Sequence, residues 1–283
     1  MPRPSTYFRT LAGVPVHYAR YADPRYGYGT RGKPYRFYCD DNFRTTLNQC
    51  FDELWTVCPL GEAEVITSAG CYVDKPGSHR LGRGFDLDAI FWSDTAFVTL
   101  HYPQDRAFYL GVEAILRKHF GTVLNFEYDA AHQDHFHIDD LSPIGFFPHH
   151  RSRVLFLQTA LTYLFDTPVA IDGQIGPQTN GAARHVLDDL GLADADDLGT
   201  PSALYDALAD VWMDLLDRAA EAGFRGVAAE KEKTPLELIE DLHAVIAHEL
   251  GGQAARKKIE TALTTFTTHE DTEAWLRQYR TEA

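Results

Sequence analysis

The chain has 283 residues, of which 45% are hydrophobic and 24% are charged, so it is long enough for two domains and has the composition of a globular protein. Its formal net charge of −15 argues against a nucleic-acid backbone as a partner. No run of about eighteen apolar residues occurs, so we expect no membrane span. The first residues also lack the apolar core of a signal peptide.

The negative charge is unevenly distributed along the chain. Residues 1–38 contain seven Lys or Arg and one acid, Asp23, which gives this segment +6 and, out of the total of −15, leaves −21 for the remainder. The segment is also rich in Tyr, Gly and Pro, which favours turns and irregular structure. We therefore expect a basic, aromatic N-terminal arm over residues 1–38. Such an arm either contacts an anionic wall polymer or docks on the acidic body of the protein.

The next segment, residues 39–147, predicts an α+β domain with a small, mainly antiparallel sheet. Apolar residues at helical spacing predict a helix from Asp40 to Val57, with Asp40 or Asp41 as its N-cap. Residues 65–68 and 123–128 have the composition of strands, and residues 105–120 predict a second helix that ends at Gly121. Helices packed on a small sheet give this fold class.

All four cysteines of the chain lie within one window of 33 residues. They are Cys39, Cys50, Cys58 and Cys71. An even, clustered set of cysteines favours disulfides and an oxidising compartment, and four cysteines allow three pairings that the sequence leaves open. Their spacing is not that of a CxxC metal site.

Two short segments, residues 77–88 and 132–139, contain the side chains that point to chemistry. Together they offer His79, Asp86, His135 and His137, a set that suits a divalent metal. Imidazoles with one carboxylate suit zinc better than magnesium or calcium, which prefer oxygen ligands. A catalytic zinc uses three such protein ligands and leaves its fourth position to water or substrate.

The same two segments predict how these side chains meet. Residues 134–139 predict a strand, in which His135, His137 and Asp139 share one face because side chains alternate across a strand. Residues 85–91 alternate in the same way. His79 precedes a turn that contains Gly82 and Gly84, and such a turn can bring His79 back to Asp86.

The combined pattern resembles the zinc D-Ala-D-Ala peptidase superfamily, which also includes the hedgehog fold. Ser78, His79, Gly82 and Asp86 match the motif Ser-x-His-x-x-Gly-x-Ala-x-Asp in register, and Gly84 replaces its Ala. A His-x-His segment follows at residues 135–137. Residues 67–72 and 129–139 look most like the extensin-like branch, and the resemblance covers about residues 40–140.

The resemblance implies a role for each matching position. One Zn²⁺ would be bound by His79, Asp86 and His137. Asp134, three residues before the last ligand, would be the general base, which requires it to lie in the turn before the strand. His135 would be a second catalytic group that orients water or steadies an oxyanion.

Four further groups have supporting roles in this comparison. Ser78 would contact substrate, and His132 would either line the substrate cleft or be an exposed loop histidine. Asp88 and Asp139 would support or cap rather than bind the metal. Extensin-like relatives typically join the strand before the His motif to an upstream cysteine, so the resemblance implies a disulfide that includes Cys71.

The second half of the chain has a different pattern, which predicts helices. Residues 143–150 look like a linker, and residues 154–164 predict an amphipathic helix. The loop Asp172–Thr179 and a second helix to about Leu190 resemble the three-helix peptidoglycan-binding module, which we place at residues 148–225. The end of the second helix departs from that module, which puts wall binding in doubt but not the helical fold.

The C-terminal part predicts further helices without a family resemblance. A helix begins at Thr200-Pro201 and continues to Leu215, residues 228–233 look like a charged connector, and residues 234–251 predict another helix that ends at Gly251. We place a helical extension at residues 226–283. It would form an added subdomain or a docking or oligomer surface.

These features predict a zinc peptidase that hydrolyses amide bonds in peptidoglycan stem peptides or cross-links. Its substrate lies in the periplasm or cell wall, so we expect delivery by phage lysis or by a secretion machine, as for an antibacterial effector. Peptidoglycan is the expected partner, together with an immunity or delivery protein. The rival prediction is a non-catalytic wall-binding protein that keeps the fold. The sequence leaves carboxypeptidase and endopeptidase activity as alternatives.

Overall fold

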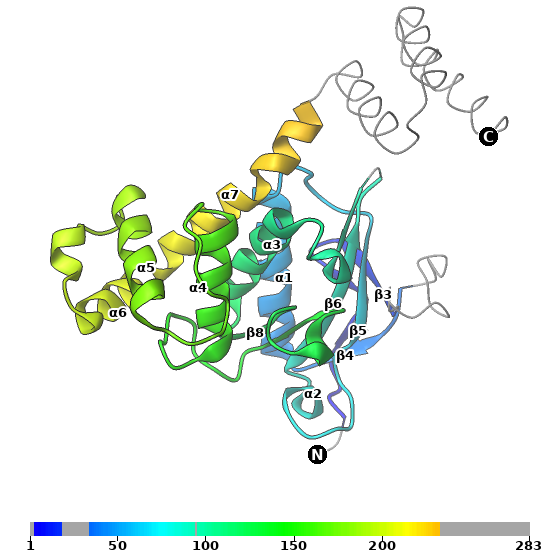
Figure 1. Cartoon of the computed structure of the whole chain (residues 1–283). Coiled ribbons are helices and arrows are strands. Elements are labelled where there is room, and N and C mark those ends of the chain that lie inside the picture. The colour runs from blue at the N-terminus through cyan, green and yellow to red at the C-terminus, as the bar shows by residue number, and fades with distance from the viewer. Residues whose placement is uncertain (1–2, 19–33, 94, 233–283) are drawn as a thin grey trace, which may run out of the picture. The chain divides into compact units, whose positions relative to one another are not determined.

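A computed structural model describes residues 3–18, 34–93 and 95–232 of the chain (Figure 1). The chain divides into two compact units, residues 1–228 and 229–283. The account below concerns the first unit, and the helix expected over residues 234–251 lies outside the described residues. Among the described residues, no helix is both long enough and apolar enough to cross a membrane.

A sheet of seven strands forms the centre of this unit. Its strand order is β2 (Thr10–Leu11), β3 (Val14–Tyr18), β5 (Val65–Gly70), β6 (Gly84–Phe91), β9 (Phe136–Asp139) and β8 (Thr122–Leu124), and β7 (Ala96–Val98) pairs with β6. All neighbouring pairs are antiparallel except β3 and β5. The expected α+β class with a mainly antiparallel sheet is therefore confirmed. The more specific peptidase fold remains a prediction.

Strand β6 is the central strand. One edge pairs with β5, and the other edge pairs with β9 near its start and with β7 near its end. All eight of its residues are buried, including Asp86 and Asp88. Carboxylates are rarely found in a strand that is covered on both faces. Carboxylates in such a position need donors close by.

The N-terminal segment forms strands where an irregular arm was expected. Tyr7–Phe8 (β1) pairs with Phe37–Tyr38 (β4) in a separate two-stranded sheet, and β2 and β3 form a hairpin at the edge of the main sheet. Leu11, Val14 and Val16 are buried in the core. The expectation of an arm was wrong for these residues because alternating apolar side chains outweighed the turn-forming composition. Residues 19–33 of the expected arm lie outside the described residues.

Two helices pack against the sheet and against each other (Figure 1). Helix α1 (Asp41–Val57) begins at the N-cap Asp40, whose carboxylate accepts from the amides of Asn42 and Phe43 at 2.9 and 3.1 Å. Helix α3 (Arg106–His119) is buried along most of its length. Both helices confirm the predicted spans. The strand expected over residues 123–128 is shorter, since β8 ends at Leu124.

Four further α-helices follow the sheet along the chain. They are α4 (Arg151–Tyr163), α5 (Pro177–Asp189), α6 (Pro201–Asp210) and α7 (Trp212–Glu232). The single helix expected from Thr200 breaks at Val211, and the connector expected from residue 228 is helical as far as Glu232. Residues 143–150 are not a bare linker, because Phe146 is buried against Trp212. The expected boundaries at residues 147/148 and 225/226 remain predictions.

A buried ion pair connects α3 with β8 and α4. Arg117 donates to Glu113 at 2.9 Å, and also to Val123 O at 3.0 Å and Ser152 O at 2.9 Å. Asn125 donates to both carboxylate oxygens of Glu113 at 3.0 and 3.1 Å. Both charged side chains are at most 2% exposed, so burial raises the pKa of Glu113 and lowers that of Arg117. The hydrogen bonds from Asn125 and to the carbonyls of Val123 and Ser152 are needed to offset the free-energy cost of burying the two charges.

Helices α3 and α7 touch at two glycines. A Cβ atom on Gly223 would lie 2.6 Å from Ala107 O and from Gly111 Cα, which is closer than real contacts allow. A Cβ atom on Gly226, one turn further along α7, would meet nothing within 4 Å.

We predict that Gly223→Ala destabilises the protein by roughly 1–3 kcal/mol, the usual cost of overpacking. The matched control Gly226→Ala should raise stability by up to about 1 kcal/mol, because Ala is the better helix former. Denaturant unfolding of both variants measures the difference. Equal stabilities would contradict the close packing of α3 on α7.

Candidate metal centre

Three buried side chains from three elements converge at one point. Asp86 lies on β6 and His137 on β9, and the two residues are direct cross-strand partners. His79 comes from the short helix α2 (Ser78–Leu81), which ends at Gly82 in the left-handed conformation with φ 68°. Gly82 allows the chain to turn at once into β6, as the sequence predicted.

The three potential ligand atoms form a nearly equilateral triangle. His79 Nε2 lies 3.1 Å from Asp86 Oδ1 and 3.1 Å from His137 Nδ1, and His137 Nδ1 lies 2.9 Å from Asp86 Oδ1. Bonds of about 2.0–2.2 Å to a tetrahedral zinc would set ligand atoms roughly 3.3–3.6 Å apart. The group is therefore compact enough to hold a metal ion after a small expansion.

The outer nitrogen atoms of both imidazoles are held by other groups. His79 Nδ1 donates to the Cys71 carbonyl at 2.5 Å, so in the neutral ring the lone pair of Nε2 points inward. His137 Nε2 lies 3.2 Å from Asp139 Oδ2, and its Nδ1 points inward. Such outer partners fix the orientation and tautomer of metal-binding histidines.

The electrostatics of the site depend on Asp86 and His137. Burial raises the pKa of Asp86, but hydrogen bonds from His137 and His79 outweigh it and hold the pKa well below its usual range. Burial lowers the pKa of His137, but hydrogen bonds to Asp139 and Asp86 outweigh it and raise the pKa to about 9. The carboxylate thus requires positive charge inside the triangle, which a proton or a metal ion can provide.

Asp134 and His135 form a hydrogen-bonded pair beside the triangle. His135 Nδ1 donates to Asp134 Oδ1 at 2.7 Å, and His135 Nε2 faces Asp86 Oδ1 at 3.8 Å. Burial lowers the pKa of His135, which favours the neutral ring with a lone pair on Nε2. Both residues precede β9, so Asp134 lies before the strand as its expected role requires.

The other expected site residues occupy supporting positions. Ser78 is buried, and its hydroxyl lies 3.2 Å from His137 Nε2, so it contacts the outer nitrogen of that ring together with Asp139. His132 is held by Asp129 at 2.7 Å, and its ring lies 5.3 Å from that of His135. Of these two, His132 lies at the margin of the group, next to His135.

Gly84 has little room for the alanine of the motif that the sequence resembles. A Cβ atom there would lie 2.7 Å from Ser78 Oγ and 3.2 Å from His137 Cε1. The glycine thus lets Ser78 and His137 pack tightly across β6.

Asp139 contacts the triangle through His137, and Asp88 is bound by Thr67 of β5. Other supporting groups were not identified from the sequence. Thr67 donates to Asp88 at 3.1 Å, and Asp139 accepts from the amide of Leu141 as well as facing His137. The Cys71 carbonyl could not be identified from residue type, because every residue has a carbonyl.

The four cysteines are free thiols, and all are buried. The expected disulfide is therefore not present in this structure. Cys39 and Cys71 are hydrogen-bonded neighbours, and burial together with Cys39 raises the pKa of the Cys71 thiol well above its usual value. A raised pKa favours the protonated thiol over the thiolate that forms disulfides.

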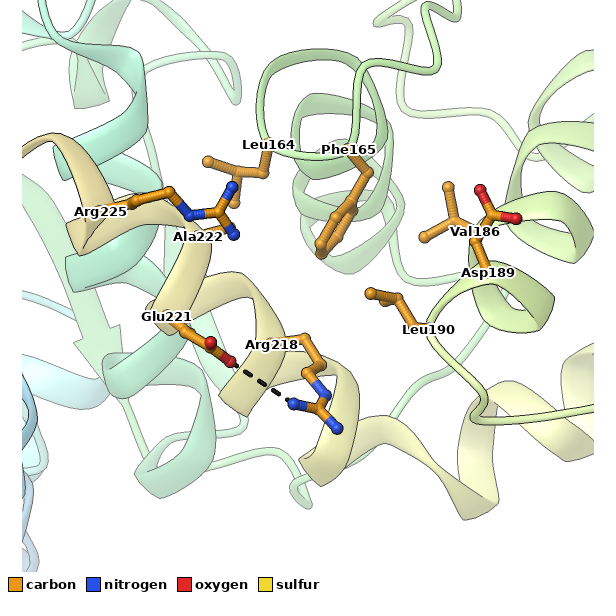
Figure 2. Close-up of a pocket in the computed structure, with 9 residues that line it drawn as sticks. All are labelled: Leu164, Phe165, Val186, Asp189, Leu190, Arg218, Glu221, Ala222 and Arg225. Carbon is orange, nitrogen blue, oxygen red and sulfur yellow. Dashed lines mark hydrogen bonds and ion pairs between the residues drawn. The ribbon is translucent and has the colours of Figure 1, made fainter.

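A cavity of about 500 Å³ lies away from the metal centre, between the end of α4, α5 and α7 (Figure 2). Apolar side chains such as Phe165 form part of its wall, and Arg218 and Glu221 face each other across 3.5 Å at its rim. No histidine or cysteine is among the residues that line it.

Comparisons of the chain with protein families, with curated proteins and with solved structures found no match.

We predict that zinc binding depends on pH, because a proton on His137 competes with the metal. Zinc affinity should rise about tenfold per pH unit from about pH 7 to the His137 pKa of about 9. Competition with a chelator at several pH values measures it. Asp139→Asn removes one hydrogen bond that raises this pKa, so its affinity should level off at a lower pH. A flat pH profile for the parent protein would contradict a metal bound by His137.

The metal-free protein should show the opposite trend in stability. The raised pKa of His137 contributes stability that is fully present below about pH 6.5 and is lost as the pH rises through about 9. The measurement is the melting temperature of the metal-free and the zinc-loaded protein, each at pH 6 and at pH 9. Zinc should stabilise more at pH 9 than at pH 6.

Proposed function

We propose that this protein is a zinc-dependent peptidase that hydrolyses amide bonds in the stem peptides or cross-links of peptidoglycan. The observation that supports the proposal most is the convergence of His79, Asp86 and His137 within 3.1 Å of one another, beside the Asp134–His135 pair. A ligand set alone would suit a binding protein or a structural metal. A buried ligand set beside a hydrogen-bonded acid–histidine pair is what hydrolysis of an amide needs.

The donor set fits zinc better than the other common divalent ions. Two imidazoles and one carboxylate are borderline ligands that favour zinc over magnesium and calcium. Three protein ligands leave a position open for water or substrate, as in catalytic zinc sites. Zn²⁺ bound here would supply a Lewis acid that polarises the scissile carbonyl and lowers the pKa of water toward neutrality.

Asp134 and His135 would carry out the proton transfers of the reaction. Asp134 accepts from His135 Nδ1, which leaves the lone pair of His135 Nε2 directed toward the ligand triangle. His135 Nε2 is thus placed to take a proton from water and to return it to the leaving amine. The spacing to His137 favours Asp134 as the base. The contacts favour a shared role, in which Asp134 orients the His135 ring and stabilises its positive charge after His135 has taken the proton.

The choice of peptidoglycan depends on the resemblance of two regions of the sequence. The motif at residues 78–86 and 135–137 resembles peptidases of that substrate, and the loop Asp172–Thr179 resembles a peptidoglycan-binding module. In the structure, buried Gln158 of α4 binds Asp172, Gln174 and Thr179 and so orders this loop. The loop is rigidly held, which is consistent with the module and with a purely structural role. The protein would act on wall outside the membrane.

A Ser–His–Asp hydrolase is a second candidate, because His137 contacts Ser78 through Nε2 and Asp86 through Nδ1. Two observations make it weaker. Asp139 Oδ2 competes for the same Nε2 atom, and His79 Nε2 occupies the space beside Nδ1. Ser78→Ala would abolish hydrolysis by a serine mechanism, whereas a chelator would not.

We predict distinct losses from three substitutions. His137→Ala removes a ligand, so zinc affinity and activity should both collapse. Asp134→Asn leaves the three ligands in place, so zinc content and melting temperature should stay near the parent values. Turnover should fall roughly 10²–10⁴-fold, the usual range for acid–base groups. His135→Ala should keep its zinc and lose at least as much turnover, because Nε2 is the atom that faces the site.

Zinc content, melting temperature and release of peptides from purified wall are measured together on these variants. His185→Ala, at an exposed position of α5, is the matched control and should behave as the parent. An Asp134→Asn protein at the parent rate would remove Asp134 from the mechanism. A zinc-loaded parent that binds wall but releases no shortened stem peptides would favour the non-catalytic alternative.

A further inference from the structure

Two arginines and two tyrosines form an exposed cluster on the outer face of the two-stranded sheet β1–β4. Tyr7 and Tyr38 are cross-strand partners with ring centroids 5.8 Å apart. The guanidinium of Arg3 lies 3.9 Å from the Tyr38 ring centre, and that of Arg36 lies 4.4 Å from the Tyr7 ring centre. We call these four residues the arginine–tyrosine cluster.

The packing behind the cluster fixes its position. Phe8 and Phe37 point to the opposite side of the same two strands, are buried, and stack with centroids 5.4 Å apart. Side chains alternate across a strand, so burial of the two phenylalanines directs Tyr7 and Tyr38 outward. Tyr7 is 41% exposed although it is a large aromatic residue.

The two arginines of the cluster differ from other exposed arginines in their contacts. Among the described residues, neither Arg3 nor Arg36 forms an ion pair with a carboxylate. Other exposed arginines such as Arg44 and Arg218 do so, with Asp41 and Glu221. A hydrogen bond to Tyr38 raises the pKa of Arg36, whose guanidinium also lies over the Tyr7 ring. The cluster is therefore a positive site on a protein with a net charge of −15.

Backbone contacts connect the cluster with the metal centre. Just after Tyr38, the amide of Asp40 donates to Gly82 O at 2.9 Å, and Gly82 ends the helix that carries His79. The amide of Tyr72 donates to Tyr38 O at 3.1 Å, next to Cys71, whose carbonyl holds His79. The cluster is thus connected through the backbone to the segment that holds His79.

We propose that the arginine–tyrosine cluster is a binding site for the peptidoglycan strand. Arg3 and Arg36 would pair with carboxylates of the strand, because a guanidinium forms charge-assisted, bidentate hydrogen bonds with a carboxylate. The free face of Tyr7 would pack against apolar surface of the strand. The identity of the polymer rests on the proposed function.

The charge of the whole protein favours this ligand over a nucleic acid. A nucleic-acid backbone carries a charge at every nucleotide, and a protein at −15 repels it at long range. A wall strand carries its carboxylates sparsely, so it meets less of this long-range repulsion, and a local pair of arginines can bind it.

The test is co-sedimentation of the full chain with purified, insoluble wall. Arg3→Gln with Arg36→Gln should weaken binding by at least about tenfold, since charge-assisted hydrogen bonds are lost. The control Arg44→Gln with Arg218→Gln removes the same charge from other exposed sites and should bind as the parent. Arg3→Lys with Arg36→Lys keeps the charge but loses the planar fork, so its affinity should be intermediate.

A second measurement leaves the protein unchanged. Wall whose carboxylates have been converted to amides should bind the parent as weakly as unmodified wall binds the Arg→Gln variant. Equal binding of the parent and the Arg→Gln variant, or of amidated and native wall, would overturn the inference. Tighter binding to a single-stranded oligonucleotide than to wall would overturn the choice of ligand.

Binding needs no turnover, so the two proposals can fail separately. A parent protein that binds wall through Arg3 and Arg36 but never cleaves it would refute the peptidase and keep the cluster. A parent that cleaves wall while the Arg→Gln variant still binds as tightly would keep the peptidase and refute the cluster.

Discussion

The burial of the Asp86 carboxylate is the constraint on which the rest of the site depends. A carboxylate on a strand covered on both faces has lost most of its water, and its charge must be met by donors or by a cation. His137 meets it from the neighbouring strand and His79 from the preceding helix. The turn at Gly82, the missing side chain at Gly84 and the register of β6 with β9 all serve to bring those two rings to one oxygen atom.

A second level of contacts keeps the two rings from turning away. The Cys71 carbonyl holds His79, while Asp139 and Ser78 hold His137. These partners come from the loop after β5, from β9 and from α2, so the geometry of the site is shared among elements far apart in sequence. Preorganisation of this kind is what lets a metal site keep its shape while a substrate changes.

The sequence predicted the parts of this arrangement that follow from local patterns. Alternation over residues 85–91 and 134–139 predicted strands, and glycines at 82 and 84 predicted the turn that returns His79 to Asp86. Helical spacing and the N-cap at Asp40 predicted α1 to within a residue. In each case the period of the apolar residues and the local turn chemistry pointed to the same structure.

The parts that sequence could not supply depend on tertiary contacts. The pairing of β3 with β5 is parallel and spans about fifty residues, so no local signal identifies it. The break between α6 and α7 at Val211 has no proline or glycine to mark it. The hydrogen bond between Asp134 and His135 requires rotamers that residue spacing does not fix.

The buried pair of Glu113 and Arg117 bears on how this chain can have been assembled. Arg117 takes acceptors from β8 and from Ser152 of α4, which lie on opposite sides of the boundary that the sequence suggests at residue 147. A recombination event that joined either side to a foreign partner would leave a buried guanidinium short of acceptors, at about 1–3 kcal/mol for each unsatisfied group. That is a large share of the net stability of a typical domain. The sheet and the helices that follow it are therefore expected to be inherited together, as one unit of exchange.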